Sequence, residues 1–184
     1  MNPNTLLFLE ERLPMSIALY PGTFDPITFG HIDIAIRASR IFSHVIAVVA
    51  HNPGKNPLFS TEERLDMVQT SLKEVANIRV ISHGGLIVNC VKETNASVII
   101  RGLRALTDFE SEFQMAYTNR KLFDAAETVF LMPSARYTYL NSTMVKQIAR
   151  LGGDITPFVP EYVREKLLQK VGEKSAAPLS GTGK

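Results

Sequence analysis

Short apolar runs alternate with amphipathic segments along most of the chain. Five runs rich in aliphatic and β-branched residues have the length of buried strands, and they cover residues 16–20, 45–50, 78–81, 98–100 and 128–131. Apolar residues at helical spacing predict one helix that opens near His31 and further helices over residues 60–74, 86–94, 107–122, 142–151 and 160–170. Strands that alternate with helices favour a parallel sheet covered on both faces. We therefore predict an α/β fold built on a doubly wound, five-stranded parallel sheet with helices on both faces.

Two of the predicted helices carry start signals in their own sequence. Ser60 with Glu63 and Thr107 with Glu110 have the spacing of capping boxes, in which a hydroxyl side chain and a carboxylate satisfy the first helical N–H groups. Another helix has a stop signal, since Gly152 follows its last apolar residue. These signals support the alternation that the apolar pattern predicts.

The predicted elements fill a single domain over residues 15–171. Met15 directly precedes the first strand, so residues 1–14 are expected to be a dispensable N-terminal extension, with Met1 or Met15 as the start. Residues 172–184 are rich in Ser, Gly, Ala and Pro, a composition typical of a disordered tail.

Composition narrows the classes of function. The 184 residues are 45% hydrophobic and 21% charged, as in an ordinary soluble globular protein. A net charge of +2 gives no basis for nucleic-acid binding. No apolar run is long enough to cross a membrane and no signal peptide is evident, so we expect a cytoplasmic protein without a membrane partner. The single cysteine, Cys90, excludes an internal disulfide, and the histidines lack the spacing of zinc ligands.

Residues 17–32, which read IALYPGTFDPITFGHI, carry the strongest chemical signal. A short apolar strand runs into a turn rich in Gly and Pro, and a helix opens directly after it. The N–H groups and the dipole at the start of that helix would face an anion, and Thr23 and His31 would add side-chain donors. A tight structural connection with a packed histidine is the alternative interpretation. We favour a phosphate site with a catalytic histidine beside it.

Polar residues also follow other predicted strands, at the edge where parallel sheets bind ligands. Lys55 lies in the loop after the second strand, and Arg101 and Arg104 directly follow the fourth. Each of these could instead be a solvated surface charge. The hydroxyl-rich segment from Tyr137 to Thr143 follows the fifth strand and would bind a second phosphate or simply cap the next helix. The sequence contains no P-loop, no dinucleotide fingerprint and no nucleophile elbow.

The string from Gly22 to Pro26, followed by Thr28 to His31, resembles the (His/Thr)-x-Gly-His signature of the nucleotidyltransferases. Together with VIIRGLRALTDFE at residues 98–110 and VFLMPS at residues 129–134, it resembles the bacterial phosphopantetheine adenylyltransferases. The resemblance extends from about Ser16 to Lys170 without large gaps. One departure is Asn141, where the family often has serine, and it leaves one nucleotide contact in doubt.

The resemblance implies a Rossmann-like fold and transfer of AMP from ATP to 4′-phosphopantetheine, which gives dephospho-coenzyme A and pyrophosphate in coenzyme A biosynthesis. It also implies Mg²⁺ carried with ATP rather than on a protein metal site, and a homohexamer. Two alternatives remain open. Another nucleotidyltransferase, making NAD or a cytidylylated alcohol, could share the first motif, and a non-catalytic nucleotide sensor could share the fold.

The family's roles carry over to positions of this sequence. The resemblance implies that the catalytic residues are His31, Thr23, Lys55 and Arg104. It places phosphopantetheine against Thr23, Lys55, Ile87 and Arg101. It places ATP against Thr23, Phe24, His31, Gly102, Leu103, Arg104, Glu112, Tyr137, Thr138, Tyr139, Leu140, Asn141, Ser142 and Thr143.

Overall fold

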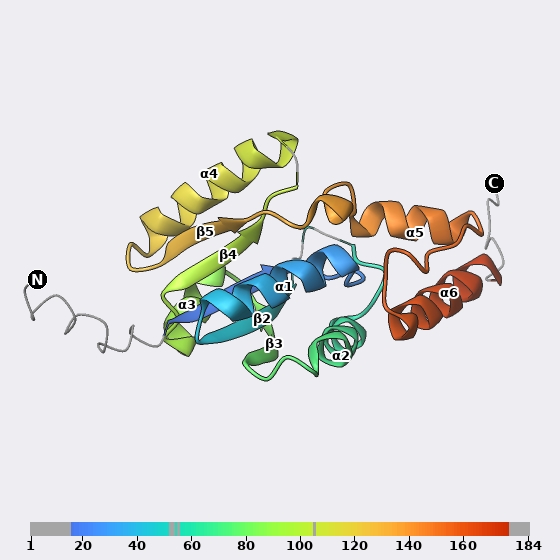
Figure 1. Cartoon of the computed structure of the whole chain (residues 1–184), viewed down its shortest axis with the longest axis horizontal. Helices are drawn as coiled ribbons and strands as arrows, with labels where there is room; N and C mark the ends of the chain where they lie inside the picture. The colour runs from blue at the N-terminus through green and yellow to red at the C-terminus, as the bar shows by residue number, and fades with distance from the viewer. Residues whose placement is uncertain (1–15, 52–53, 55, 105, 177–184) are drawn as a thin grey trace, which may run out of the picture.

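The computed structural model describes residues 16–51, 54, 56–104 and 106–176. Its centre is a five-stranded sheet in the order β3-β2-β1-β4-β5, in which all neighbours are parallel (Figure 1). The strands are β1 (Ile17–Gly22), β2 (His44–His51), β3 (Ile78–Gly84), β4 (Val98–Gly102) and β5 (Glu127–Leu131). The helices are α1 (Phe29–Ile41), α2 (Thr61–Leu72), α3 (Ile87–Thr94), α4 (Leu106–Leu122), α5 (Ser142–Arg150) and α6 (Glu161–Ala176), with a short 3-10 helix, η3 (Ala135–Tyr137).

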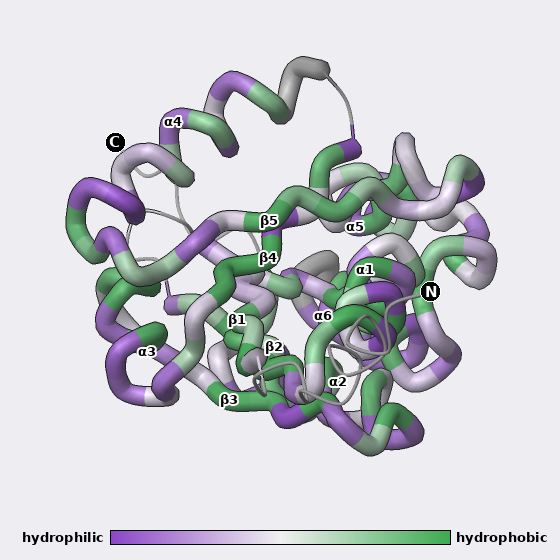
Figure 2. Tube along the Cα trace, turned by 60° about the vertical axis from the view of Figure 1, so that its left-hand side comes forward, coloured by the Kyte–Doolittle hydropathy of each residue, from purple (hydrophilic) through white to green (hydrophobic). Residues whose placement is uncertain are grey.

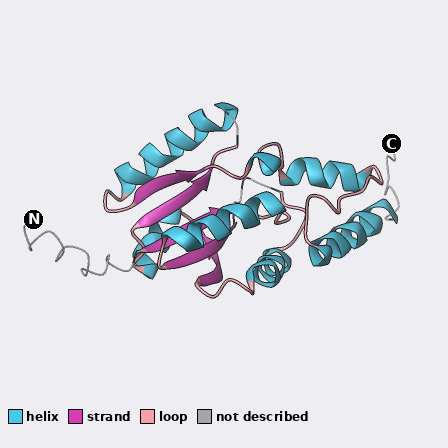
Figure 3. Cartoon of the chain, in the orientation of Figure 1, coloured by secondary structure: helices cyan, strands magenta, loops and turns pink. Residues whose placement is uncertain are grey.

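Helices cover both faces of the sheet, so the predicted α/β architecture is confirmed (Figure 3). Alternate residues of a strand point to opposite faces, and β2 feeds a separate core on each side. Val45, Ala47 and Val49 pack into the larger cluster, which includes residues of α1, α2, α5 and α6. Ile46 and Val48 pack into the smaller cluster with residues of α3. Figure 2 shows the resulting concentration of hydrophobic residues along the strands.

The order of the strands in the sheet predicts where a ligand binds. The winding starts at β1 and proceeds outward to β3, then returns to the other side of β1 with β4. Ligands of such sheets bind where the order reverses, at the carboxyl ends of the strands. In Figure 1, α5 and α6 lie beyond these strand ends. Among the described residues, no helix combines the length and apolar character needed to cross a membrane.

The structure corrects two expectations about helix ends. Helix α6 continues through Ala176, so the expectation of a disordered tail from residue 172 is wrong for residues 172–176. A helix once formed propagates through weak formers, and Gln169 donates to Glu173 at 3.1 Å across this turn. Helix α4 begins at Leu106, which places Thr107 inside the first turn rather than before it. Residues 1–14 and 177–184 lie outside the described part, so the expected extension and the rest of the tail stay predictions.

The other predicted capping box is confirmed at the start of α2. Ser60 Oγ accepts a hydrogen bond from the Glu63 N–H at 3.2 Å, and Glu63 Oε2 accepts one from the Ser60 N–H at 2.7 Å. Two of the first helical donors are satisfied in this way. The box therefore begins α2 directly after the loop that approaches the ligand-binding edge.

Candidate active site

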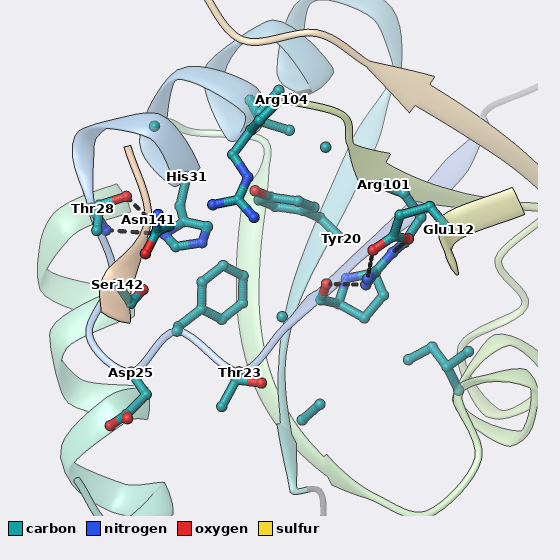
Figure 4. Close-up of a pocket in the computed structure, with 18 of the residues that line it drawn as sticks. Tyr20, Thr23, Asp25, Thr28, His31, Arg101, Arg104, Glu112, Asn141 and Ser142 are labelled. Carbon is teal, nitrogen blue, oxygen red and sulfur yellow. Dashed lines mark hydrogen bonds and ion pairs between the residues drawn. The ribbon is translucent and has the colours of Figure 1, made fainter. Parts of the chain in front are cut away.

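A pocket of about 1030 Å³ lies at the carboxyl ends of the strands (Figure 4). Its walls come from the segments that follow all five strands, including the turn after β1, the end of β3, the loop after β4 and the segment between η3 and α5. Most residues predicted for the site line this pocket, namely Thr23, Phe24, His31, Ile87, Arg101, Gly102, Arg104, Glu112, Tyr137, Leu140, Asn141, Ser142 and Thr143.

Four predicted site residues do not join this group. Leu103, Thr138 and Tyr139 do not line the pocket. Thr138 instead donates to the carbonyl of Ala135 at 2.9 Å, and Tyr139 is 61% exposed. Lys55 lies outside the described residues, so its predicted role stays a prediction.

His31 stands in the first turn of α1 and is oriented by the residue that precedes the helix. The Thr28 N–H donates to His31 Nδ1 at 3.1 Å, and Thr28 Oγ1 lies 3.0 Å from the same nitrogen. Because Nδ1 accepts a hydrogen bond, the proton of the neutral ring resides on Nε2. Burial, together with the positive charge of Arg104, lowers the pKa of His31 to about 4. At neutral pH the residue is therefore an uncharged donor through Nε2.

The turn after β1 depends on a glycine and an unusual backbone angle. Phe24 adopts a φ of 48°, in the left-handed region that side chains rarely occupy. Its ring lies over Gly22, where an added Cβ would come within 2.7 Å of the ring. The same ring stands edge-on to the His31 imidazole, with centroids 5.2 Å apart. Gly22 thus makes room for an aromatic ring that contacts the histidine.

Asp25 anchors this turn to two distant segments. Its carboxylate accepts hydrogen bonds from the N–H groups of Leu58 and Phe59, each at 3.0 Å, and forms an ion pair with Lys146 of α5. The side chain of Asp25 is almost fully buried, so these partners replace the water it has lost. In the sequence Asp25 appeared only as part of a motif, and its partners lie too far along the chain for any local pattern to identify them.

Arg64 binds backbone carbonyl groups at the ends of two strands that border the site. Arg64 was not identified from the sequence. It is 1% exposed and donates from Nη1 to the carbonyls of Thr23 at 2.7 Å and Ala50 at 3.0 Å. It therefore fixes the ends of β1 and β2 relative to each other. One signal could have found it: Arg64 shares a helical face with the buried Met67 and Val68, and an arginine on an apolar face needs internal acceptors.

Arg101 and Glu112 form a bidentate ion pair inside the pocket. Arg101 Nε donates to Glu112 Oε2 at 2.5 Å and Nη2 donates to Oε1 at 2.6 Å, while Nη1 donates to the carbonyl of Pro21 at 3.0 Å (Figure 4). Burial opposes the charged form, but the hydrogen bonds and charge of Glu112 prevail and raise the pKa of Arg101. The resemblance assigned these residues to different substrates, whereas the structure makes them partners.

The segment after β5 is fastened over the start of α1. Asp33 of α1 accepts hydrogen bonds from the N–H and the hydroxyl of Ser134, at 2.8 and 2.7 Å. Asn141 Oδ1 accepts from the Met144 N–H at 2.9 Å, so this residue caps α5. Ser142 donates to the carbonyl of Pro26 at 2.8 Å and joins the two halves of the pocket rim. The interpretation that this segment caps the next helix is thus correct for Asn141. Asn141 also lines the pocket.

The pocket gathers positive charge and neutral donors on one side. Arg104 donates from Nη1 to the carbonyl of Leu140 at 3.1 Å, which holds its guanidinium beside His31 (Figure 4). An arginine, a neutral imidazole donor and the N-terminus of α1 together favour a bound phosphate chain.

Comparison with known proteins agrees with this chemistry. The model of the cytidylyltransferase-like family matches residues 19–148. The phosphopantetheine adenylyltransferase of Dictyoglomus thermophilum is 53% identical over 157 residues, which cover 85% of this chain and 96% of the relative. The chain belongs to the phosphopantetheine adenylyltransferase family. Another member, from Carboxydothermus hydrogenoformans, is 54% identical over 85% of this chain and 96% of its own length.

Membership of this family confirms the resemblance found in the sequence. The fold is shared more widely. A protein from Vibrio parahaemolyticus assigned as a nicotinate-nucleotide adenylyltransferase superimposes with a TM-score of 0.65 at 18% identity, over 85% of this chain and 94% of its own. That likeness concerns the fold alone and supports the Rossmann-like sheet expected from the sequence.

Proposed function

We propose that this protein transfers AMP from ATP to 4′-phosphopantetheine, giving dephospho-coenzyme A and pyrophosphate. The observation that carries the proposal is the neutral donor of His31, which lies beside Arg104 at the N-terminus of α1. The chain that holds this donor is about half identical to phosphopantetheine adenylyltransferases. Donors of this kind suit a reaction between two phosphates, which needs positioning and charge stabilisation above all.

The reaction requires no general base from the protein. A phosphate monoester is largely ionised at neutral pH, so an oxygen of the phosphopantetheine phosphate attacks the α-phosphorus of ATP directly. The bond from this phosphorus to the bridging oxygen breaks, and pyrophosphate leaves with the electron pair. Negative charge moves onto the oxygens around the α-phosphorus, where the Nε2–H of His31 would donate a hydrogen bond. The lowered pKa of His31 keeps this donor uncharged and in one tautomer.

The two substrates would occupy opposite halves of the pocket. We assign ATP to the half formed by Phe24, Gly102, Arg104, Tyr137 and residues 140–143. We assign phosphopantetheine to Thr23, Ile87 and Arg101, with Lys55 as a further phosphate ligand. Three hydrogen bonds already occupy the Arg101 guanidinium, but its remaining N–H groups suit a phosphate oxygen.

We propose that Mg²⁺ enters with the nucleotide. Within the described ranges, no group of three or more His, Cys, Asp or Glu residues is placed to hold a metal ion. Mg²⁺ commonly keeps most of its waters and binds through substrate phosphates, and here it would neutralise charge on the phosphate chain. Arg104 and His31 would then hold the phosphate oxygens that face the protein.

We further propose a homohexamer that works in the cytoplasm, where ATP is available. An exposed aromatic face on α4 supports self-association. Phe109, Phe113 and Tyr117 are 45%, 44% and 62% exposed, and they follow one another at four-residue spacing. Exposed apolar patches of this kind mark protein interfaces.

The decisive experiment offers ATP with a panel of phosphate-bearing acceptors and measures pyrophosphate release. We expect release with 4′-phosphopantetheine and little with nicotinate mononucleotide or glycerol phosphate.

His31→Ala should stay folded and bind ATP within severalfold of the parent, but its turnover should be about 10²–10³-fold slower. His44→Ala is the matched control, because His44 is exposed at the opposite end of β2.

Two outcomes would contradict the proposal. ATP binding without pyrophosphate release from any acceptor would indicate the nucleotide sensor. Parental turnover in His31→Ala would remove the histidine from the reaction and leave it a structural role.

A further inference from the structure

The hydroxyl group of Tyr20 is a polar group that the fold itself does not use. Tyr20 lies on β1, two residues before the turn, and is 5% exposed. Its ring packs edge-on against Phe24, with centroids 5.5 Å apart. In the part of the chain that the structure describes, no hydrogen bond to the Tyr20 hydroxyl is formed. Every buried side-chain nitrogen or oxygen of the described residues has a hydrogen-bond partner, so the unpartnered Tyr20 oxygen is not sealed in the core but opens to the pocket that Tyr20 lines.

The hydroxyl faces the pocket rather than the core. Tyr20 lines the same pocket as His31 and Arg104, and Figure 4 shows its oxygen beside the Arg104 guanidinium, on the side toward His31. Arg101 also acts on Tyr20 electrostatically. Three donors from three segments therefore converge: β1, the first turn of α1 and the loop after β4.

The hydroxyl can serve only as a donor in this place. Burial raises the pKa of Tyr20 well above its usual range, so the O–H keeps its proton at any working pH. Packing gives no reason for the oxygen, because the ring packs against the apolar Phe24 and belongs to the larger apolar core. A phenylalanine would fill the same space in the core, so the oxygen contributes nothing to packing.

We propose that the Tyr20 hydroxyl donates a hydrogen bond to a phosphate oxygen of the bound nucleoside triphosphate, alongside Arg104 and His31. The inference rests on the proposed function for the identity of this ligand and adds a residue to its binding site. Only when a phosphate is bound does the hydroxyl gain an acceptor, so its contribution appears in binding and turnover and not in folding.

The test is Tyr20→Phe in the full chain. Hydrogen bonds to charged groups are the strong ones, so we expect affinity for ATP and kcat/KM for ATP to fall about 10- to 100-fold. Affinity for adenosine, which carries no phosphate, should stay within about twofold of the parent. The melting temperature should be unchanged or slightly higher, because no hydrogen bond within the protein is lost.

Tyr162→Phe is the matched control. Its hydroxyl donates to Asp66 at 2.5 Å, between α6 and α2 and away from the pocket. The Tyr162→Phe substitution removes the same hydroxyl oxygen from a different tyrosine, so ATP affinity and turnover should stay unchanged.

Three results would overturn the inference: parental ATP affinity and kcat/KM in Tyr20→Phe, an equal loss for ATP and adenosine, or a lowered melting temperature that accounts for the loss of activity. A parent that binds ATP no better than adenosine would also overturn it. Failure of the proposed function is a separate result. If the parent binds ATP but releases no pyrophosphate with phosphopantetheine, the function fails, while the contrast between ATP and adenosine still tests Tyr20.

Discussion

At the scale of single residues, hydrogen bonds within the protein determine which atoms of the site remain available to a ligand. The Thr28 N–H occupies His31 Nδ1, and this one contact decides that Nε2 carries the proton. The carboxylate of Glu112 occupies one edge of Arg101, so a ligand must approach the guanidinium from its remaining edge. In both cases a neighbouring residue, rather than the functional residue itself, sets the direction in which the donor acts.

The lowered pKa of His31 predicts a pH-dependent loss of stability. The unfolded imidazole takes up a proton below pH 6.5, whereas the folded one stays neutral down to about pH 4. The unfolded state therefore binds more protons across this window, and stability falls as the pH falls. Between pH 7 and pH 5 this residue should cost about 2 kcal/mol of unfolding free energy.

Urea unfolding of the parent and of His31→Gln at both pH values measures this contribution. The glutamine variant does not titrate at this position, so its loss between pH 7 and pH 5 should be smaller by about 2 kcal/mol. Equal losses in the two proteins would contradict the neutral state assigned to His31.

Arg101 should affect the acceptor more than ATP. Arg101→Ala removes a guanidinium that Glu112 and the Pro21 carbonyl hold in one orientation, and we expect phosphopantetheine affinity to fall about 10- to 100-fold. ATP affinity should change by less than about threefold. Direct binding measurements with each substrate check this, with Arg164→Ala as control, because Arg164 is half-buried on α6 and does not line the pocket. Equal weakening of both substrates would contradict the assignment of Arg101 to the acceptor.

At the scale of elements, the strand–turn–helix unit from β1 to α1 works as one piece. The left-handed φ of Phe24 turns its ring back over Gly22 and against His31. Asp25 and Arg64 then tie the turn to α2 and α5 through buried hydrogen bonds and an ion pair. The orientation of His31 therefore depends on the shape of the whole turn as well as on Thr28.

Gly22→Ala should disturb this unit. The new Cβ would lie 2.7 Å from the Phe24 ring, and the ring cannot withdraw easily because it is buried between Tyr20 and His31. We expect about 1–3 kcal/mol of destabilisation, typical of overpacking, and reduced turnover. Gly84→Ala is the control, since a Cβ there meets nothing within 4 Å. Thermal unfolding and turnover of both variants measure the effect, and similar results for the two would refute it.

At the scale of the whole molecule, two features stand out. The pocket is assembled from segments that follow all five strands, so its shape depends on the complete sheet. Helix α4 lies beside β5 at the edge of the sheet (Figure 1), and Phe109 of its aromatic face also packs near Phe130 of β5. A partner subunit on this face would cover rings that the described residues leave exposed.

A charge on α4 should weaken the assembly. Tyr117→Glu introduces a carboxylate into the aromatic face, next to Phe113, whose ring lies 4.8 Å away. Desolvating this charge in an interface is unfavourable, so light scattering should show a smaller species than the parent. Leu151→Glu, at a 79% exposed position after α5, is the control for an added charge at an exposed apolar site. A parent that is monomeric, or a variant that assembles like the parent, would contradict the proposed use of α4.

Local sequence patterns are enough to predict the order of the elements and the edge of the sheet at which the site lies. Apolar runs and helical spacing are local properties, and they predicted all five strands close to their observed positions. Parallel strands joined by helices must bring their carboxyl ends together. Thr23, His31, Arg101 and Arg104 could therefore be placed in one pocket before any contact was known.

The pairing of these residues, in contrast, depends on contacts between distant parts of the chain. Three contacts of the site join residues that lie 11 to 121 positions apart in the sequence. They are the ion pair of Arg101 with Glu112, the hydrogen bond from Arg64 to the Thr23 carbonyl and the ion pair of Asp25 with Lys146. No periodic pattern encodes such contacts, because a local spacing specifies a face or a turn and not the partner that packs against it. For the same reason the resemblance places Leu103, Thr138 and Tyr139 against ATP although they do not line the pocket, and no local pattern distinguishes the hydroxyl of Tyr20.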